Sequence, residues 1–200
     1  CLSVARHAVA LPVVVFSATN SAWSHCDERN ASEMDPESKK TALRMIPYGL
    51  YVLTSEASDG RVAAATVNWV TQASFEPPLV AVGVKVGSAT HEVIQESGAF
   101  ALNVLGKAQQ TVAFAFFKPP EREGDTIAGE PFSSGKSGSP ILGVAAAFVD
   151  CRLTDAVERG DHSLFIGEVI DAGVAGRIYG RPDDATLILR ELGEKTFYGG

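Results

Sequence analysis

Strand-like segments follow one another along this sequence without a helix between each pair. The segments rich in β-branched, aromatic and other apolar residues are 49–55, 61–70, 79–86, 100–105, 141–153 and 163–174. Helices are expected at 35–45, 89–96 and 109–117. A doubly wound parallel sheet needs a crossover helix between successive strands, and several successive strands here have no helix between them. The sequence therefore predicts a mainly β fold, an antiparallel barrel or sandwich with inserted helices.

Turn residues define the connections between these segments. The turn signal at 58–60 predicts that 49–55 and 61–70 pair as a β-hairpin. The double proline at 119–120 stops the third helix. The stretch 121–140 is rich in Gly, Ser, Pro and charged residues, so we expect a loop there.

The composition is that of one globular domain with an acidic balance. The chain has 200 residues, 46% hydrophobic and 20% charged, which suffices for one core but not for two full-sized domains. Acidic residues outnumber Lys and Arg by 24 to 17, which disfavours binding to a nucleic-acid backbone. The 3 cysteines and 4 histidines are scattered without CxxC or HExxH spacing. We therefore expect no nucleic-acid partner, no disulfide framework and no metal site.

Residues 1–33 differ from the rest of the chain. Arg6 precedes an apolar run at 8–16, which is too short to span a bilayer. The first methionine is Met34, and the sequence from there resembles a natural protein start. Three interpretations stay open: upstream sequence included by a wrong start, a truncated export signal, or a structural extension. We expect the folded domain to be 34–200, with no membrane span.

Polar side chains gather at the end of the second strand and in the loop after it. The stretch 66–74 places Thr, Asn, Thr, Gln and Ser around the indole of Trp69, and Pro77 and Pro78 follow. Hydroxyls and backbone N–H groups of such a loop can bind the edge of a ring or a phosphate. Ordinary polar positions on a strand and its turn would have the same composition, so both interpretations remain.

A second candidate is the junction between the third strand and the following helix. Ser88 stands at the expected N-cap, with Lys85 before it and Thr90 and His91 in the first turn. Free N–H groups and the helix dipole favour an anion at a helix N-terminus, and these side chains suit a phosphate monoester. A capped helix with a solvated lysine and a surface histidine is the simpler alternative.

Two further positions could take part in chemistry. His162 follows Asp161 at the start of a strand, where the carboxylate could orient or charge the imidazole for proton or hydride transfer. Lys118 ends the third helix, which suits the helix dipole without any function. A turn followed by a half-exposed strand residue explains 160–162 equally well. Cys151 is expected to pack as a small apolar residue.

Several short motifs lie in a characteristic order along the chain. They are TVNWVTQASFEPPLV at 66–80, SATHEVI at 88–94, SGAFALNVL at 97–105, GDHSLFIGEV at 160–169 and FYGG at 197–200. Together they resemble the flavin reductase-like family, the FMN-binding split barrels. The similarity covers about 42–200. It implies a mainly β, antiparallel Greek-key split barrel with inserted helices.

The resemblance also implies which residues hold the cofactor. The implied flavin-binding residues are Thr66, Asn68, Trp69, Val70, Thr71, Lys85, Ser88, Thr90, His91 and Lys118. Those at 68–71 would contact the flavin ring and ribityl chain, and those at 85–91 would lie near the phosphate. Lys118 would stabilise the charge of the reduced flavin. His162, the implied catalytic residue, would face the nicotinamide.

The activity implied by the resemblance is reduction of FMN by NADH or NADPH. The flavin accepts the hydride, and the protein supplies binding, orientation and charge. The family resemblance further implies a homodimer with FMN in a groove near the subunit interface. A cytoplasmic location fits the free thiols and the supply of reduced nicotinamide. A monooxygenase or an electron-transfer partner protein could take the electrons.

Two departures from the family pattern keep other functions open. Trp69 stands where the family often has Ser, and Gln72 replaces another common Ser. The indole could stack against the flavin. Both departures fit a flavoredoxin-like branch, in which an FMN-containing electron-transfer flavoprotein is reduced by a protein partner. A non-catalytic flavin or haem binding module is the second alternative.

Overall fold

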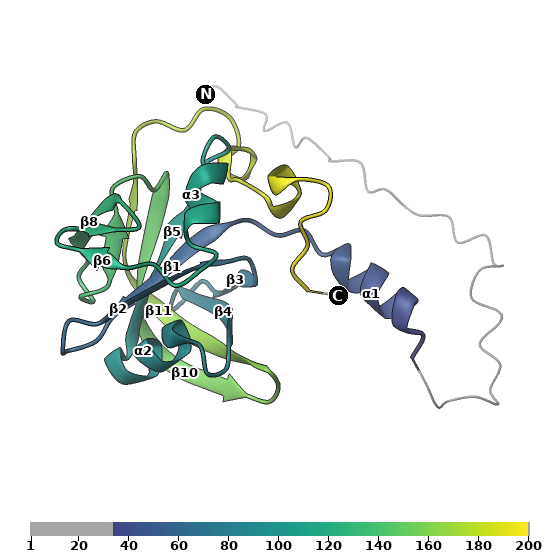
Figure 1. The fold of residues 1–200 in the computed structure, drawn as a ribbon, viewed down its shortest axis with the longest axis horizontal. Coiled ribbons are helices and arrows are strands. Elements are labelled where there is room, and N and C mark those ends of the chain that lie inside the picture. The colour runs from purple at the N-terminus through teal and green to yellow at the C-terminus, as the bar shows by residue number, and fades with distance from the viewer. Residues whose placement is uncertain (1–33, 200) are drawn as a thin grey trace, which may run out of the picture. The chain divides into compact units, whose positions relative to one another are not determined.

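The computed structural model describes residues 34–199, and within them the chain is mainly β. The strands of the larger sheet are β1 (Tyr51–Glu56), β2 (Val62–Val67), β3 (Val70–Ser74), β4 (Leu79–Lys85), β5 (Ala99–Val104), β10 (Ala147–Glu158) and β11 (His162–Val174). They form a seven-stranded sheet in the order β2-β1-β5-β10-β11-β4-β3 (Figure 1). Every neighbouring pair is antiparallel. The mainly β, antiparallel prediction is therefore confirmed.

Asn68 and Trp69 join the two edge strands of this sheet. β2 lies at one edge and β3 at the other, yet only these residues separate Val67 from Val70. Such a link spans at most about 11 Å. The sheet must therefore curl until its edges approach each other at this point. The prediction of one continuous strand at 61–70 was wrong, because the Val70 N–H donates to the Asn68 carbonyl at 3.0 Å in a tight turn.

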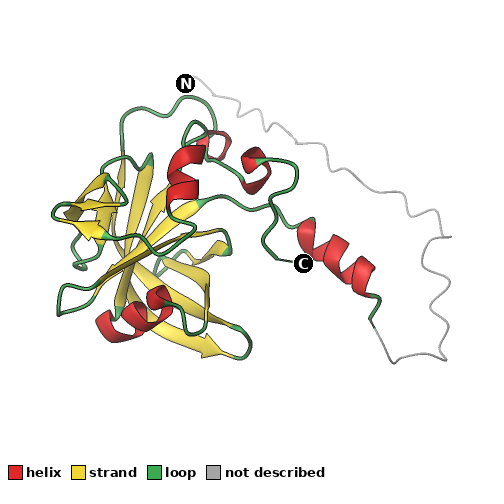
Figure 2. Cartoon of the chain, viewed as in Figure 1, coloured by secondary structure: helices red, strands yellow, loops and turns green. Residues whose placement is uncertain are grey.

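The described helices are those that the sequence predicted. They are α1 (Pro36–Arg44), α2 (Ala89–Ser97) and α3 (Gln110–Ala115), with short 3₁₀ helices at Pro182–Ala185 and Leu189–Leu192 (Figure 2). In α2 the Ser88 hydroxyl accepts a hydrogen bond from the His91 N–H at 3.2 Å, as expected of an N-cap. Gly98 ends the helix at φ 65°, and its N–H donates to the Ile94 carbonyl. The helix boundaries thus follow from local capping chemistry.

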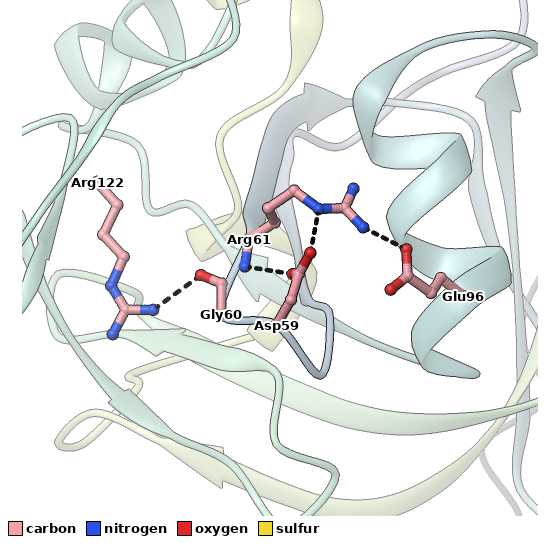
Figure 3. Close-up of polar contacts among 5 residues, drawn as sticks. All are labelled: Asp59, Gly60, Arg61, Glu96 and Arg122. Carbon is pink, nitrogen blue, oxygen red and sulfur yellow. Dashed lines mark hydrogen bonds and ion pairs between the residues drawn. The ribbon is translucent and has the colours of Figure 1, made fainter.

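The predicted hairpin of β1 and β2 is present, and charged side chains hold its turn (Figure 3). Asp59 accepts hydrogen bonds from the backbone N–H and the guanidinium of Arg61. The Arg61 guanidinium also donates to Glu96 on α2, and Arg122 donates to the Gly60 carbonyl at 3.4 Å. Exposed ion pairs of this kind contribute roughly 0–1 kcal/mol each, so they orient the turn more than they stabilise the fold.

A second sheet, four-stranded within the described residues, occupies much of the segment expected to be a loop. Its strands are β6 (Arg122–Glu123), β7 (Thr126–Ile127), β8 (Glu130–Ser134) and β9 (Pro140–Leu142). The loop prediction for 121–140 was wrong, because β6 and β7 have only 2 residues each and the sequence of β8, EPFSS, shows no alternation of apolar and polar residues. The strand expected at 141–153 likewise begins only at Ala147. Asp150 supports this region, since its carboxylate accepts from the Ser137 N–H at 2.8 Å.

Apolar side chains of the large sheet and its helices form the core. One cluster includes Leu53, Phe100, Phe165 and Cys151. Burial, together with the charge of Asp150, raises the pKa of the Cys151 thiol to about 12. The thiol therefore stays neutral and packs as an apolar side chain, as the sequence predicted.

Residues 1–33 and 200 lie outside the described residues, and the interpretations of the N-terminal segment lie there too. Between residues 34 and 199, no helix has the length and apolar character needed to cross a bilayer. The same residues bring together no group of three His, Cys, Asp or Glu side chains suited to a metal ion.

Candidate functional site

A cavity of about 270 Å³ lies between β2, at one edge of the curled sheet, and β4, the neighbour of the other edge strand. The β2 strand supplies one wall, and the end of β4 with the first turn of α2 supplies the opposite wall. Residues 116–120, after α3, form a third side, and Tyr198 lies at the cavity as well. These elements are distant in the sequence, so the cavity exists only because the sheet curls.

A second cavity, of about 190 Å³, adjoins the first. The residues that line both are Thr66, Val67, Asn68, Phe117 and Tyr198. The smaller cavity is otherwise mainly apolar, with Leu50, Leu189 and Phe197 in its walls. Tyr198 and Asn68 therefore line both parts of one cleft.

One end of the larger cavity has the chemistry to bind an anion. The backbone N–H groups of Ala89 and Thr90, in the first turn of α2, donate no hydrogen bond to any described residue. The Thr90 hydroxyl is also without a partner there, although Thr90 is only 5% exposed. Lys85 and Lys118 line the same cavity and form no ion pair within 34–199. Free amides, the helix dipole and two ammonium groups together favour a phosphate.

Ser88 lines this end too, but its hydroxyl already serves the helix. It donates to the Lys85 carbonyl at 2.8 Å and accepts from the His91 N–H at 3.2 Å. Its one proton is therefore used, and it cannot donate to an anion without losing the Lys85 bond. By capping the helix, Ser88 positions the backbone N–H groups of Ala89 and Thr90, and its own hydroxyl does not donate to the anion.

Asn68 brings an unsatisfied donor to the cleft. Its Nδ2 is buried and has no hydrogen-bond partner among the described residues. A buried donor without a partner costs about 1–3 kcal/mol, which an acceptor on a ligand would recover. The neighbouring Thr66 holds the wall in place, since its hydroxyl donates to the Ala113 carbonyl at 2.7 Å and its N–H to the Phe116 carbonyl at 3.0 Å.

Trp69, His162 and Tyr198 form an aromatic cluster beside the larger cavity. The Trp69 ring centroid lies 4.5 Å from that of His162 and 5.4 Å from that of Tyr198. The His162 Nδ1 lies 3.0 Å from an Asp161 carboxylate oxygen, and Nε2 lies 2.8 Å from the Tyr198 hydroxyl. The hydrogen bond from His162 lowers the pKa of Asp161 below its ordinary value. Burial, with the charge of Asp161, raises the pKa of the Tyr198 phenol.

The structure brings some predicted site residues to the cavity and leaves others away from it. Thr66, Asn68, Lys85, Ser88, Thr90 and Lys118 line it, whereas Trp69, Val70, Thr71, His91 and His162 do not. His91 points instead to the sheet, where its Nε2 meets the Ser163 hydroxyl at 2.8 Å. Helical geometry explains this, because successive residues of a helix point about 100° apart, so His91 leaves the face of Thr90 and packs against Phe165. The turn before β3 directs Val70 and Thr71 away from the cavity.

Tyr198 and Phe117 are cavity residues that the site predictions omitted. The only sequence signal for Tyr198 was its place in the FYGG motif at 197–200. For Phe117, the sequence signal was its place at the end of the helix expected at 109–117, and Phe117 is half exposed. Neither signal locates a side chain relative to Asn68, which lies far away in the sequence.

Comparison with known proteins identifies the family of this chain. The model of the flavin reductase like domain matches residues 43–188. The chain belongs to the flavin reductase-like family. The resemblance inferred from the motifs is therefore confirmed.

Relatives within the flavin reductase-like family cover different shares of the chain. A flavin reductase of Pseudomonas putida is 31% identical over 169 residues, 84% of this chain and 92% of that protein. A probable flavin reductase of Rhizobium meliloti is 32% identical over 76% of this chain, and the chain spans only about half, 49%, of that protein. The structure of the Streptomyces globisporus NADH:FAD oxidoreductase SgcE6, in complex with NAD and FAD fragments, matches with a TM-score of 0.65 and 26% identity. That match covers 84% of this chain and 98% of that one.

Proposed function

We propose that this protein is an NAD(P)H-dependent flavin reductase that binds FMN. The observation that carries the proposal is a single cleft with free phosphate donors at one end and the unsatisfied Asn68 amide further along it. FMN has a phosphate at one end and a ring with carbonyl acceptors at the other. Membership of the flavin reductase-like family supports the same class of ligand.

The described residues fit this cofactor. The first turn of α2 would hold the phosphate through the N–H groups of Ala89 and Thr90 and the Thr90 hydroxyl, with charge from Lys85. Asn68 would donate to an acceptor on the ring, and Thr66 would keep that wall in place. A bound flavin supplies a two-electron acceptor for the hydride of reduced nicotinamide. Lys118 would place positive charge at the cavity, which favours an electron-rich flavin.

We further infer that the curled sheet closes as a split barrel and that two chains pair. Phe114 in α3 and Phe117 just after it support the pairing, because they are 47% and 50% exposed and contact each other edge to face, with their ring centroids 5.2 Å apart. Covering such a pair with a second copy would remove apolar surface from water. A cytoplasmic location fits the supply of reduced nicotinamide, and a monooxygenase or electron-transfer protein is the proposed acceptor.

The proposal is tested on the full chain by visible spectroscopy. FMN is added, binding is followed by the shift of the flavin band, and NADH or NADPH is then mixed in without oxygen. We expect binding that is tighter for FMN than for riboflavin, and bleaching within seconds with at least one nucleotide. Equal affinity for FMN and riboflavin would contradict the phosphate site.

The same experiment separates the alternative functions. A bound flavin that ignores both nucleotides but bleaches with dithionite would favour an electron-transfer flavoprotein or a flavin-binding module. Reduction by a protein partner would then distinguish those two. A comparison of FMN with FAD decides which flavin is preferred.

A further inference from the structure

Tyr198 stands between His162 and the cavity proposed to hold flavin. The Tyr198 ring lines both cavities, whereas His162 lines neither and its side chain is only 14% exposed. The two side chains meet through the Tyr198 hydroxyl and the His162 Nε2, 2.8 Å apart. The imidazole therefore meets the cavity through the phenol of Tyr198.

Asp161 determines which way the hydrogen bonds run. An ionised carboxylate can only accept, so the His162 Nδ1 that lies 3.0 Å from it must carry the proton. In the neutral imidazole Nε2 is then an acceptor, and the Tyr198 hydroxyl donates to it. Asp161, His162 and Tyr198 thus form one chain of hydrogen bonds that ends at the cavity.

Side chains rather than backbone pairing hold Tyr198 in this place. Among the described residues, the N–H groups of Phe197, Tyr198 and Gly199 donate no backbone hydrogen bond. Arg44 lies 4.4 Å from the Phe197 ring centroid, and its Nε donates to the Gly199 carbonyl at 3.4 Å. Within residues 34–199 the Tyr198 side chain forms one hydrogen bond, to His162, and its ring packs against Trp69 with the ring centroids 5.4 Å apart. The hydrogen bond to His162 therefore sets the direction of the phenol hydroxyl.

We propose that Tyr198 is the residue that faces the nicotinamide and the flavin in this cleft, and that His162 acts through it as a positioning residue. The inference rests on the proposed reductase function. It differs from the role expected from the sequence, in which His162 itself faces the nicotinamide. Replacing either residue would remove the same hydrogen bond, so the two substitutions should have one shared effect.

The test is a double-mutant cycle with a conservative rescue. The full-length proteins are wild type, Tyr198→Phe, His162→Ala, His162→Gln and the two double variants. Each is loaded with FMN, and its anaerobic reduction by NADH or NADPH is followed by stopped flow. FMN affinity is measured separately, and a value within about threefold of wild type shows that the cleft is intact.

We expect Tyr198→Phe and His162→Ala each to slow reduction roughly three- to tenfold, the effect of one lost hydrogen bond. His162→Gln should recover most of the wild-type rate, because an amide can still accept from the phenol. With Phe at position 198, exchanging His162 for Ala or Gln should change nothing further. A wild-type rate for Tyr198→Phe, or a further loss when His162→Ala is added to it, would overturn the inference.

A spectroscopic measurement on the flavin-free protein tests the contact itself. The ring ¹⁵N signals of His162, assigned by their loss in His162→Gln, should show a protonated Nδ1 and an unprotonated Nε2. The Nε2 signal should move in Tyr198→Phe, and an unchanged signal would overturn the contact. Failure of the reductase function would look different, because wild-type protein with bound FMN would then not be reduced by either nucleotide.

Discussion

Gly83 on β4 lies directly against the indole of Trp69. The Gly83 N–H donates to the Trp69 carbonyl at 2.9 Å, and a Cβ placed on Gly83 would lie 3.1 Å from Trp69 Cε3. Ordinary van der Waals contacts begin at about 3.4 Å, so the bare backbone at this position lets the indole rest on the strand. The indole in turn supports His162 and Tyr198.

Gly83→Ala should therefore push the indole away from β4. We expect the free energy of unfolding to fall by about 1–2 kcal/mol, the cost of adding a methyl group to a packed site. Urea unfolding measures this change. Gly160→Ala is the matched control, because nothing lies within 4 Å of a Cβ there, and it should change stability by less than about 0.5 kcal/mol. Equal effects of the two substitutions would mean that Trp69 is not held as described.

Asn68→Leu should have opposite effects on folding and on binding. Removing the unsatisfied buried Nδ2 should stabilise the flavin-free protein by about 1 kcal/mol, since the side chain has no partner to lose. The affinity for FMN should fall about tenfold, because a donor to the ring is gone. Thermal unfolding and FMN titration measure the two effects. Lower stability of the free variant would show that Asn68 is already satisfied.

Thr90→Val and Ser88→Ala should separate binding from capping. Thr90→Val keeps the shape of the side chain but removes its hydroxyl, so FMN should bind about tenfold more weakly while riboflavin binds as before. Ser88→Ala removes the N-cap of α2, so it should cost about 1 kcal/mol of stability and affect FMN less. Titrations with both flavins and urea unfolding provide the comparison. A riboflavin affinity that falls as much as that of FMN would rule out Thr90 as a phosphate ligand.

The Asp161 carboxylate should titrate below its ordinary pKa of 3.8, chiefly because His162 donates a hydrogen bond to it. A lowered pKa in the folded state means that the ionised Asp161 carboxylate favours folding above pH 3.8. That contribution is lost as the pH falls through the folded value. A carboxyl ¹³C titration should give a midpoint below 3.8 in wild type, and His162→Ala should move it back toward 3.8. A wild-type midpoint at or above 3.8 would mean that the pair does not form.

Local chemistry in the sequence determined much of the fold. Segments rich in β-branched, aromatic and other apolar residues identified the strands, Ser88 and Gly98 identified the ends of α2, and ordered motifs identified the flavin reductase-like family. These signals depend on residues that are close together in the sequence, so they can be recognised without the tertiary structure. Where a strand has only two residues, as in β6 and β7, no such signal exists.

Only the tertiary structure decided which of the candidate residues share a site. Asn68 and Thr90 meet in one cavity because the edges of the sheet approach each other, and no local pattern encodes that curl. The same packing brings His91 to Ser163 and places Tyr198 between His162 and the cavity. Contacts between residues far apart in sequence depend on the path of the whole chain. The sequence by itself determined the family and the helix end proposed to bind an anion, while the fold determined which side chains face the cavity.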